Sequence, residues 1–233
     1  MIQKKRAHYS IVILNLIMTQ EIKKKIEDYG LLLEADPDFP SIVGLVTGEK
    51  IKGSWWGHRK GHKIFSISRK IRDEADILVI KLISGKVTYV HKRLWTDLIS
   101  IFIAKQNWQI GKMSKNGKRI LELVEKAGVI RADNMETQTT NKFNKIDLNK
   151  AINEIEKGLL IFCNEVHTEK GYHVKLLKTW NHFLKEKSIT ISGQKDIVAA
   201  KENIDKIVAE LNTKFDSTAR LPWWTKNKFD NTE

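Results

Sequence analysis

The sequence has few of the residues that cross-link a chain, interrupt it or carry it through a membrane. Cys163 is the single cysteine among 233 residues, which excludes an internal disulfide framework and a four-cysteine zinc site. Three prolines are too few for a long proline-rich linker. The apolar stretch 11–18 follows a basic run but is too short to span a bilayer. We expect it to be a buried strand or the start of a helix in a cytoplasmic protein.

Acidic residues are also in short supply. The chain has 41 lysines and arginines against 28 acidic residues, so its formal net charge is +13. Its content of hydrophobic residues, 41%, and of charged residues, 30%, is typical of a soluble globular protein. A compact chain with this excess of positive charge requires an anionic partner. We therefore expect it to bind DNA or RNA rather than a membrane.

Hydrophobic periodicity predicts an α+β fold with helices and two β-hairpins. Helices are expected over 20–35, 42–46, 58–75, 94–104, 115–127, 147–157, 180–187 and 196–211, and hairpins over 77–91 and 159–178. Ser41, Ser114 and Asp147 are expected to cap the helices that follow them, and Gly48 to end the first of these. Ile64, Ile67 and Ile71 are expected to form the buried stripe of the helix over 58–75. Residues 133–146 are polar and are expected to form a loop with at most one helical turn. We predict a basic domain over 1–110, a winged-helix-like domain over 111–190, and a C-terminal helix and tail over 191–233.

The winged-helix prediction depends on the order of elements across 114–178, which is helix, short strand, loop, helix and hairpin. The helix over 147–157 takes the place of a recognition helix, and 159–178 the place of the wing. Cations and acids nearly balance on that helix, so it is expected to act as scaffold rather than to read a groove. A generic α+β core has the same order of elements, and both interpretations stay open.

Basic charge is concentrated between residues 50 and 93, where 12 lysines and arginines accompany three acidic residues. Cations that neutralise phosphates, beside aromatic rings that stack on bases, are typical of a nucleic-acid-binding surface. A solvated lysine-rich surface with tryptophans in the core is the alternative. The candidate nucleic-acid-binding residues are Trp55, Trp56, Arg59, Lys60, Lys63, Arg69, Lys70, Lys86, Lys92 and Arg93.

Trp55 and Trp56 lie between two glycines and directly before His58. Adjacent side chains of an extended segment point to opposite sides, so we expect one tryptophan in the core and the other in a cleft. His58 or His62 is expected to line the same cleft. On a helix these two histidines share a face and could hold a metal, although Arg59 stands where the zinc-protease pattern requires glutamate. A phosphate contact, an acid–base role and plain packing are alternatives.

A second group, His167, Glu169 and His173, flanks the turn of the second predicted hairpin. A loop over 169–171 makes the two histidines cross-strand partners, whereas a loop over 170–171 places His173 opposite Thr168. Only the first register allows a two-histidine site. The candidate catalytic residues are therefore His58, His62, His167, Glu169 and His173, and no metal or cofactor is assigned. Asp36 and Asp38 are expected to form a helix-ending turn rather than a catalytic pair.

Three separated motifs resemble a family of prokaryotic proteins of unassigned function over about residues 30–185. They are Gly-Ser-Trp-Trp-Gly-His over 53–58, the Gly-Lys-Val-Thr run over 85–88, and Glu-Val-His-Thr-Glu over 165–169. Some members are related to winged-helix DNA glycosylases that excise alkylated or crosslinked bases. The resemblance implies a winged-helix element and association with DNA in repair. The glycosylases' Gln-x-Gln motif is absent, because 106–109 has the wrong spacing, so no catalytic residue is transferred.

The leading hypothesis is thus a cytoplasmic nucleic-acid-binding protein related to DNA repair. A hydrolase or nuclease that uses the histidines is the second hypothesis. A non-catalytic interaction protein with a basic surface is the third.

Overall fold

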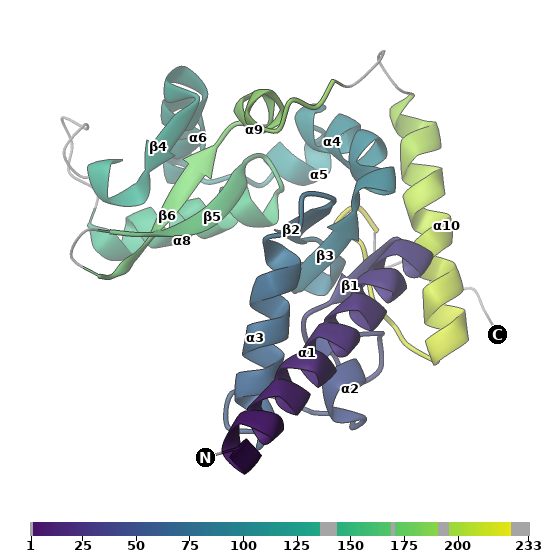
Figure 1. Cartoon of the computed structure of the whole chain (residues 1–233). Coiled ribbons are helices and arrows are strands. Elements are labelled where there is room, and N and C mark those ends of the chain that lie inside the picture. The colour runs from purple at the N-terminus through teal and green to yellow at the C-terminus, as the bar shows by residue number, and fades with distance from the viewer. Residues whose placement is uncertain (1, 136–143, 169–170, 191–195, 225–233) are drawn as a thin grey trace. The chain divides into compact units, whose positions relative to one another are not determined.

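The computed structural model describes residues 2–135, 144–168, 171–190 and 196–224, with side chains from Leu14 onward (Figure 1). The chain has the predicted α+β class, with helices around two three-stranded antiparallel sheets. It divides into two compact units. Unit 1 comprises Met1–Trp95 and Glu202–Leu221, and unit 2 comprises Thr96–Lys201 and Pro222–Glu233. No helix in the described part of the chain is both long enough and apolar enough to cross a membrane.

Unit 1 is a small sheet covered by helices. Its strands pair in the order β1-β3-β2, with Leu32 opposite Tyr89 and Val79 opposite the same tyrosine on the other side. The elements are α1 (Ile2–Tyr29), β1 (Leu31–Leu33), α2 (Ile42–Thr47), α3 (Gly61–Arg72), β2 (Ile77–Lys81), β3 (Val87–His91) and the greater part of α10 (Ile197–Phe215).

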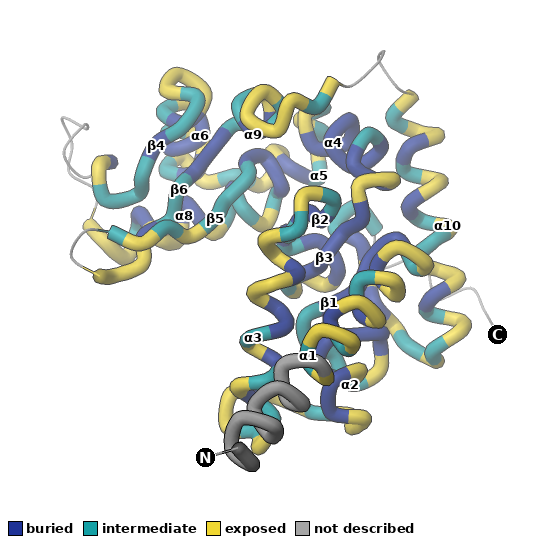
Figure 2. Tube along the Cα trace, viewed as in Figure 1, coloured by how far each residue is buried: buried dark blue, intermediate teal, exposed yellow. Residues whose placement is uncertain are grey.

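The core of unit 1 is formed where α1 and α3 contact the sheet. Ile22 and Ile26 of α1 and Ile64 and Ile67 of α3 are fully or almost fully buried, and Trp55 belongs to the same cluster. In Figure 2, buried segments (dark blue) and exposed segments (yellow) alternate along α3. The predicted inner stripe of this helix is confirmed.

The N-terminal helix differs from its prediction at both ends. Residues 11–18 are helical, which is the second of the two expected alternatives, and the exposure of Leu14, Leu16 and Ile17 shows that the buried strand is wrong. The helix ends at Gly30, whose φ of +82° favours glycine, and residues 31–33 form a buried strand instead of a last helical turn. A β-carbon at Gly30 would also lie 2.7 Å from the Arg93 guanidinium, whose side chain would have to shift.

Other local predictions for unit 1 are confirmed. Ser41 caps α2 by accepting a hydrogen bond from the Gly44 N–H, and Gly48 ends the helix with a φ of 75°. The hairpin over 77–91 forms with its turn at Ser84 and Gly85. The helix expected from His58 begins only at Gly61.

Unit 2 places two packed helices beside its sheet. Its strands pair in the order β4-β6-β5. Ile120 and Val124 of α6 and Ile152 and Ile155 of α8 form the buried interior with the strands. The elements are α4 (Trp95–Ile103, whose first residue belongs to unit 1), α5 (Asn107–Ile110), α6 (Lys115–Ala127), β4 (Val129–Arg131), α8 (Lys145–Lys157), β5 (Phe162–His167), β6 (His173–Lys178) and α9 (Trp180–Glu186).

The helix starts of unit 2 are set by side-chain caps. Ser114 caps α6 as predicted, and its hydroxyl and N–H also donate to the Glu154 carboxylate of α8, at 2.5 and 2.7 Å. The cap of α8 is Asn144, three residues before the predicted Asp147, because the Asn144 side chain accepts from the Asp147 N–H at 2.8 Å. Residues 136–143, which form most of the predicted polar loop, lie outside the described residues.

Candidate functional site

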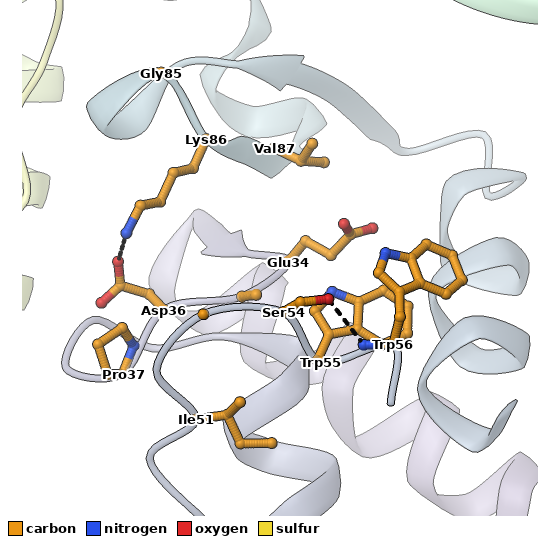
Figure 3. Close-up of a pocket in the computed structure, with 12 residues that line it drawn as sticks. Glu34, Asp36, Pro37, Ile51, Ser54, Trp55, Trp56, Gly85, Lys86 and Val87 are labelled. Carbon is orange, nitrogen blue, oxygen red and sulfur yellow. Dashed lines mark hydrogen bonds and ion pairs between the residues drawn. The ribbon is translucent and has the colours of Figure 1, made fainter. Parts of the chain in front are cut away.

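A pocket of about 470 Å³ opens in unit 1 (Figure 3). Its walls come from residues 34–37 after β1, from the loop over 51–56, and from residues 85–87 at the β2–β3 turn. A volume of this size is typical of sites for small ligands. The pocket combines two carboxylates, one lysine and two indole rings.

The tryptophan pair forms one wall of the pocket. Trp55 is 6% exposed and Trp56 is 65% exposed, which confirms the prediction that one is buried and the other is not. The predicted opposite directions are wrong, because the two rings stack with centroids 4.2 Å apart and planes at 20°. The chain begins to turn at Trp56, where the Ser54 hydroxyl accepts from its N–H, so the segment is not extended. Neither His58 nor His62 lines this pocket.

Gly61 allows this turn to lie against the first turn of α3. A β-carbon at Gly61 would lie only 2.9 Å from the Trp56 carbonyl oxygen. The Gly61 N–H donates to the His58 carbonyl at 2.7 Å, and the His58 N–H donates to the Trp55 carbonyl at 3.0 Å. Gly61, which lies between His58 and His62, therefore helps to position the two tryptophans.

Glu34 is a pocket residue that the sequence analysis missed. It directly follows the buried strand β1, and its Oε1 accepts from the Tyr89 hydroxyl at 3.1 Å and lies 3.6 Å from the Arg72 guanidinium. Tyr89 is fully buried, and this burial together with the Glu34 charge raises the pKa of its hydroxyl to about 12. The tyrosine therefore remains a hydrogen-bond donor. The signal that would have identified Glu34 is its position at a strand end, which the helical prediction over 20–35 concealed.

Asp36 closes the other end of the pocket and is fully engaged. Its Oδ1 accepts from the N–H groups of Asp38 and Phe39 at 2.9 and 2.8 Å, which is the predicted turn chemistry. Its Oδ2 pairs with the Lys86 ammonium at 2.5 Å. Partial burial acts to raise the pKa of Asp36, but Lys86 and the two N–H groups outweigh it, so the pKa lies below its ordinary value. Asp36 is therefore an anion that neutralises Lys86.

The Asp36 contacts predict acid-sensitive stability. Because the folded pKa of Asp36 lies below its ordinary value of 3.8, its stabilisation is complete above that value and is lost as pH falls through the folded pKa. Asp36→Asn is expected to lower the free energy of unfolding by about 1–2 kcal/mol at neutral pH, with the difference from wild type narrowing near pH 3. Urea denaturation at both pH values measures this. Asp38→Asn is the control, since Asp38 is half exposed and pairs with the exposed Lys50. A constant difference at both pH values would contradict the assignment.

Four of the predicted phosphate-binding cations contact the protein itself. The Lys60 ammonium donates to the carbonyls of Val46 and Thr47 at the end of α2, at 3.1 and 2.9 Å. The Arg93 guanidinium donates to two carbonyls at the end of α1. Both cations complement the negative end of a helix. Arg59 lies 3.4 Å from Glu49, and Lys86 pairs with Asp36 as above.

The cations on the outer side of α3 face solvent. Arg69 and Lys70 are exposed and Lys63 is half-buried, while the buried positions of the helix lie on the opposite side. Phe65 is also about half exposed on this side, and its ring centroid lies 5.8 Å from that of Trp56. We call this set the α3 face, and its members are His62, Lys63, Phe65, Arg69 and Lys70. Lys92, after β3, is exposed as well.

The first histidine pair does not share a helical face. His58 precedes α3, its Nδ1 accepts from the Lys60 N–H, and its Nε2 lies 3.6 Å from Glu49. His62 lies on α3 and is exposed. The helical spacing expected for a metal pair is absent because the helix begins at Gly61. Within the described residues, no group of three histidine, cysteine or acidic side chains could hold a metal ion.

The second histidine pair forms in unit 2. His167 and His173 are cross-strand partners with ring centroids 4.0 Å apart. The hairpin therefore has the register predicted for the longer loop, over 169–171. His173 also lies 3.8 Å from the Glu165 carboxylate. Glu169 lies outside the described residues. The two histidine pairs belong to different units of the chain.

Comparison with known proteins gives one finding. Residues 17–221 match the model of a protein family described as AlkZ related. The matched range includes the pocket, the α3 face and the hairpin that carries the second histidine pair. No curated protein and no solved structure matches the chain.

Proposed function

Because the chain belongs to the AlkZ-related family, we propose that it binds DNA and acts in DNA repair in the manner of a glycosylase. The observation that supports this best is the α3 face beside Trp56. Exposed cations attract phosphates, and exposed aromatic rings next to them stack on bases. Trp56 and Phe65 supply the rings, and Lys63, Arg69 and Lys70 supply the charges.

The order of elements in unit 2 supports a winged-helix interpretation. Helix α6, strand β4, helix α8 and the β5–β6 hairpin follow each other, and β6 lies between β4 and β5. In this interpretation α8 takes the place of a recognition helix. The Lys175 ammonium of the hairpin is bound to Glu156 and Asn153 of α8, at 2.6 and 3.0 Å. These contacts support a scaffold role for α8, and we assign the principal DNA contact to the α3 face.

A DNA-binding measurement with matched charge variants tests the proposal. The triple substitution Lys63→Gln, Arg69→Gln and Lys70→Gln is expected to lower affinity for a short oligonucleotide at least tenfold. It is also expected to make the log–log dependence of affinity on salt shallower by about 2–3, because each phosphate contact contributes roughly 0.7–0.9. Fluorescence anisotropy between low and physiological salt gives both quantities.

A control on α8 separates the two candidate surfaces. Lys145, Lys150 and Lys157 are exposed on α8, and their replacement by glutamine removes the same net charge. We expect this variant to retain nearly the wild-type salt dependence. The reverse result, a shallower slope only for the α8 variant, would move the DNA contact to α8. If the salt dependence of affinity were unchanged in both variants, neither surface would be the DNA contact.

The repair activity has its own test. A glycosylase breaks the bond between C1′ of the sugar and the base nitrogen. The oxygen of water bonds to C1′, and the base leaves with the bonding electron pair and a proton. Incubation with duplexes that contain an alkylated base is expected to release the free base, which mass spectrometry detects. Strand cleavage without base release, lost on replacement of His167 and His173, would instead favour the nuclease hypothesis. Binding without either reaction would favour a non-catalytic role.

A further inference from the structure

We propose that the pocket at Trp56 receives a single nucleobase drawn out of a DNA strand, with its ring stacked on the Trp56 indole and an N–H of its edge bound to Glu34. The inference rests on the proposed function, since DNA is the source of the base. It adds the place where one base is held and the groups that hold it.

Trp56 is a preformed stacking surface. Its ring is 65% exposed, yet it is held parallel to the buried ring of Trp55 at 4.2 Å. An exposed aromatic ring that neighbouring groups already orient loses little freedom when a flat ligand stacks on it. Proteins that extrude a base hold it against aromatic or apolar side chains in this way.

The charges of the pocket exclude phosphate as its ligand. Glu34 and Asp36 are acidic, and the single lysine in the wall, Lys86, is neutralised by Asp36. Because the Arg72 guanidinium likewise lies 3.6 Å from Glu34, a phosphate would meet two carboxylates whose cations are already paired with them. A neutral ring with N–H donors on its edge fits this wall, because a carboxylate only accepts hydrogen bonds. The phosphates are left to the cations of the α3 face.

Glu34 is held in position for this contact. Both the Tyr89 hydroxyl and the Arg72 guanidinium approach Oε1. These contacts use Oε1, and in the proposed complex the base binds at Oε2. Figure 3 shows the carboxylate directed toward the Trp56 ring. Tyr89 is thus a positioning residue for the Glu34 carboxylate, which would accept the hydrogen bond from the base.

Oligonucleotides with a single base separate base binding from phosphate binding. We compare a short strand of abasic spacers with the same strand that carries one adenine at its centre. The adenine is expected to raise affinity by roughly tenfold or more. Trp56→Ala is expected to abolish this increment and to leave affinity for the spacer strand unchanged, whereas Trp56→Phe retains most of the increment. An equal loss for both strands would mean that the ring contacts the backbone, which overturns the inference.

Three further variants test the specific contacts. Tyr172→Ala removes an exposed ring that belongs to unit 2 and does not line the pocket, so the adenine increment is expected to persist. Glu34→Gln adds a donor to the wall, so the protein is expected to accept a base whose edge has carbonyls and no N–H, such as N3-methylthymine, nearly as well as adenine. Tyr89→Phe is expected to reduce the increment without changing spacer affinity. If Glu34→Gln bound adenine and the carbonyl-edged base in the same ratio as wild type, Glu34 would be excluded as the group that recognises the base.

Failure of this inference is distinguishable from failure of the proposed function. A spacer strand that binds with the expected salt dependence, but gains nothing from adenine, leaves DNA binding intact and removes the base pocket. If no strand binds, the proposed function fails, and adenosine alone then tests the pocket. Adenosine that shifts the Trp56 indole N–H signal in an NMR titration supports the pocket, and no shift at millimolar adenosine overturns it.

Discussion

Trp55→Ala is expected to lower the free energy of unfolding by about 3–5 kcal/mol, whereas Trp56→Ala changes it by less than about 1 kcal/mol. The reason is burial. Trp55 packs in the core cluster with residues such as Ile64 and Ile67 of α3, so its removal leaves a large cavity. Trp56 is exposed and loses mainly its stacking contact with Trp55. Hydrogen exchange followed by mass spectrometry is the suitable measurement, because it reports on each unit of the chain by itself.

Comparing Trp55→Ala with Trp56→Ala separates a binding defect from a folding defect. Loss of protection in unit 1 for Trp55→Ala, with none for Trp56→Ala, means that a binding defect in the second variant is not a folding defect. Trp55→Phe is the control and is expected to recover part of the lost stability. Equal loss of protection in both alanine variants would show that the tryptophan motif is structural as a whole.

Trp180→Ala is expected to destabilise unit 2 by a similar amount, about 3–5 kcal/mol. Its ring is almost fully buried among Phe102, Phe162 and Phe183, with ring centroids 5.1 to 6.0 Å away. Its indole N–H donates to the Leu159 carbonyl at 2.7 Å. Leu159 has a φ of +53°, which is strained for a leucine, and the hydrogen bond helps to hold the chain in that conformation.

The phenylalanine variant separates the two contributions of Trp180. Trp180→Phe keeps most of the ring but leaves the buried Leu159 carbonyl without its donor, so we expect a loss of about 1–3 kcal/mol. Amide exchange in α8, α9 and the strands of unit 2 measures both variants. If Trp180→Phe destabilised as strongly as Trp180→Ala, the hydrogen bond and not the cavity would dominate.

Local interactions explain which elements could be predicted from the sequence. The starts of α2 and α6 follow from Ser41 and Ser114, because a capping hydroxyl bonds an N–H three residues along the chain. The hairpin over 77–91 follows from two β-branched arms around Ser84 and Gly85. The inner side of α3 follows from isoleucines at helical spacing. Each of these signals lies within a few residues of the feature that it determines.

The histidine hairpin lies at the limit of this local information. The residues over 167–173 allowed two registers, and the observed one pairs His167 with His173. The six cross-strand pairs from Phe162 to His167 have to agree with a single register. That choice also has to satisfy β4, which pairs with the far side of β6. The residues of the turn contain no information on this pairing, because β4 lies far earlier in the chain, with Arg131 opposite Leu176.

The sequence by itself determined most of the helices, the caps of α2 and α6, the two hairpins and the concentration of basic charge over 50–93. Only the tertiary structure decided which of those charges are available, because Lys60 and Arg93 bind the ends of helices that are distant in the sequence. It also decided the pocket, where Glu34 meets Tyr89 across the sheet, 55 residues later in the chain. Such contacts depend on strand pairing and on packing between remote segments, and the periodicity of one segment contains no information on either.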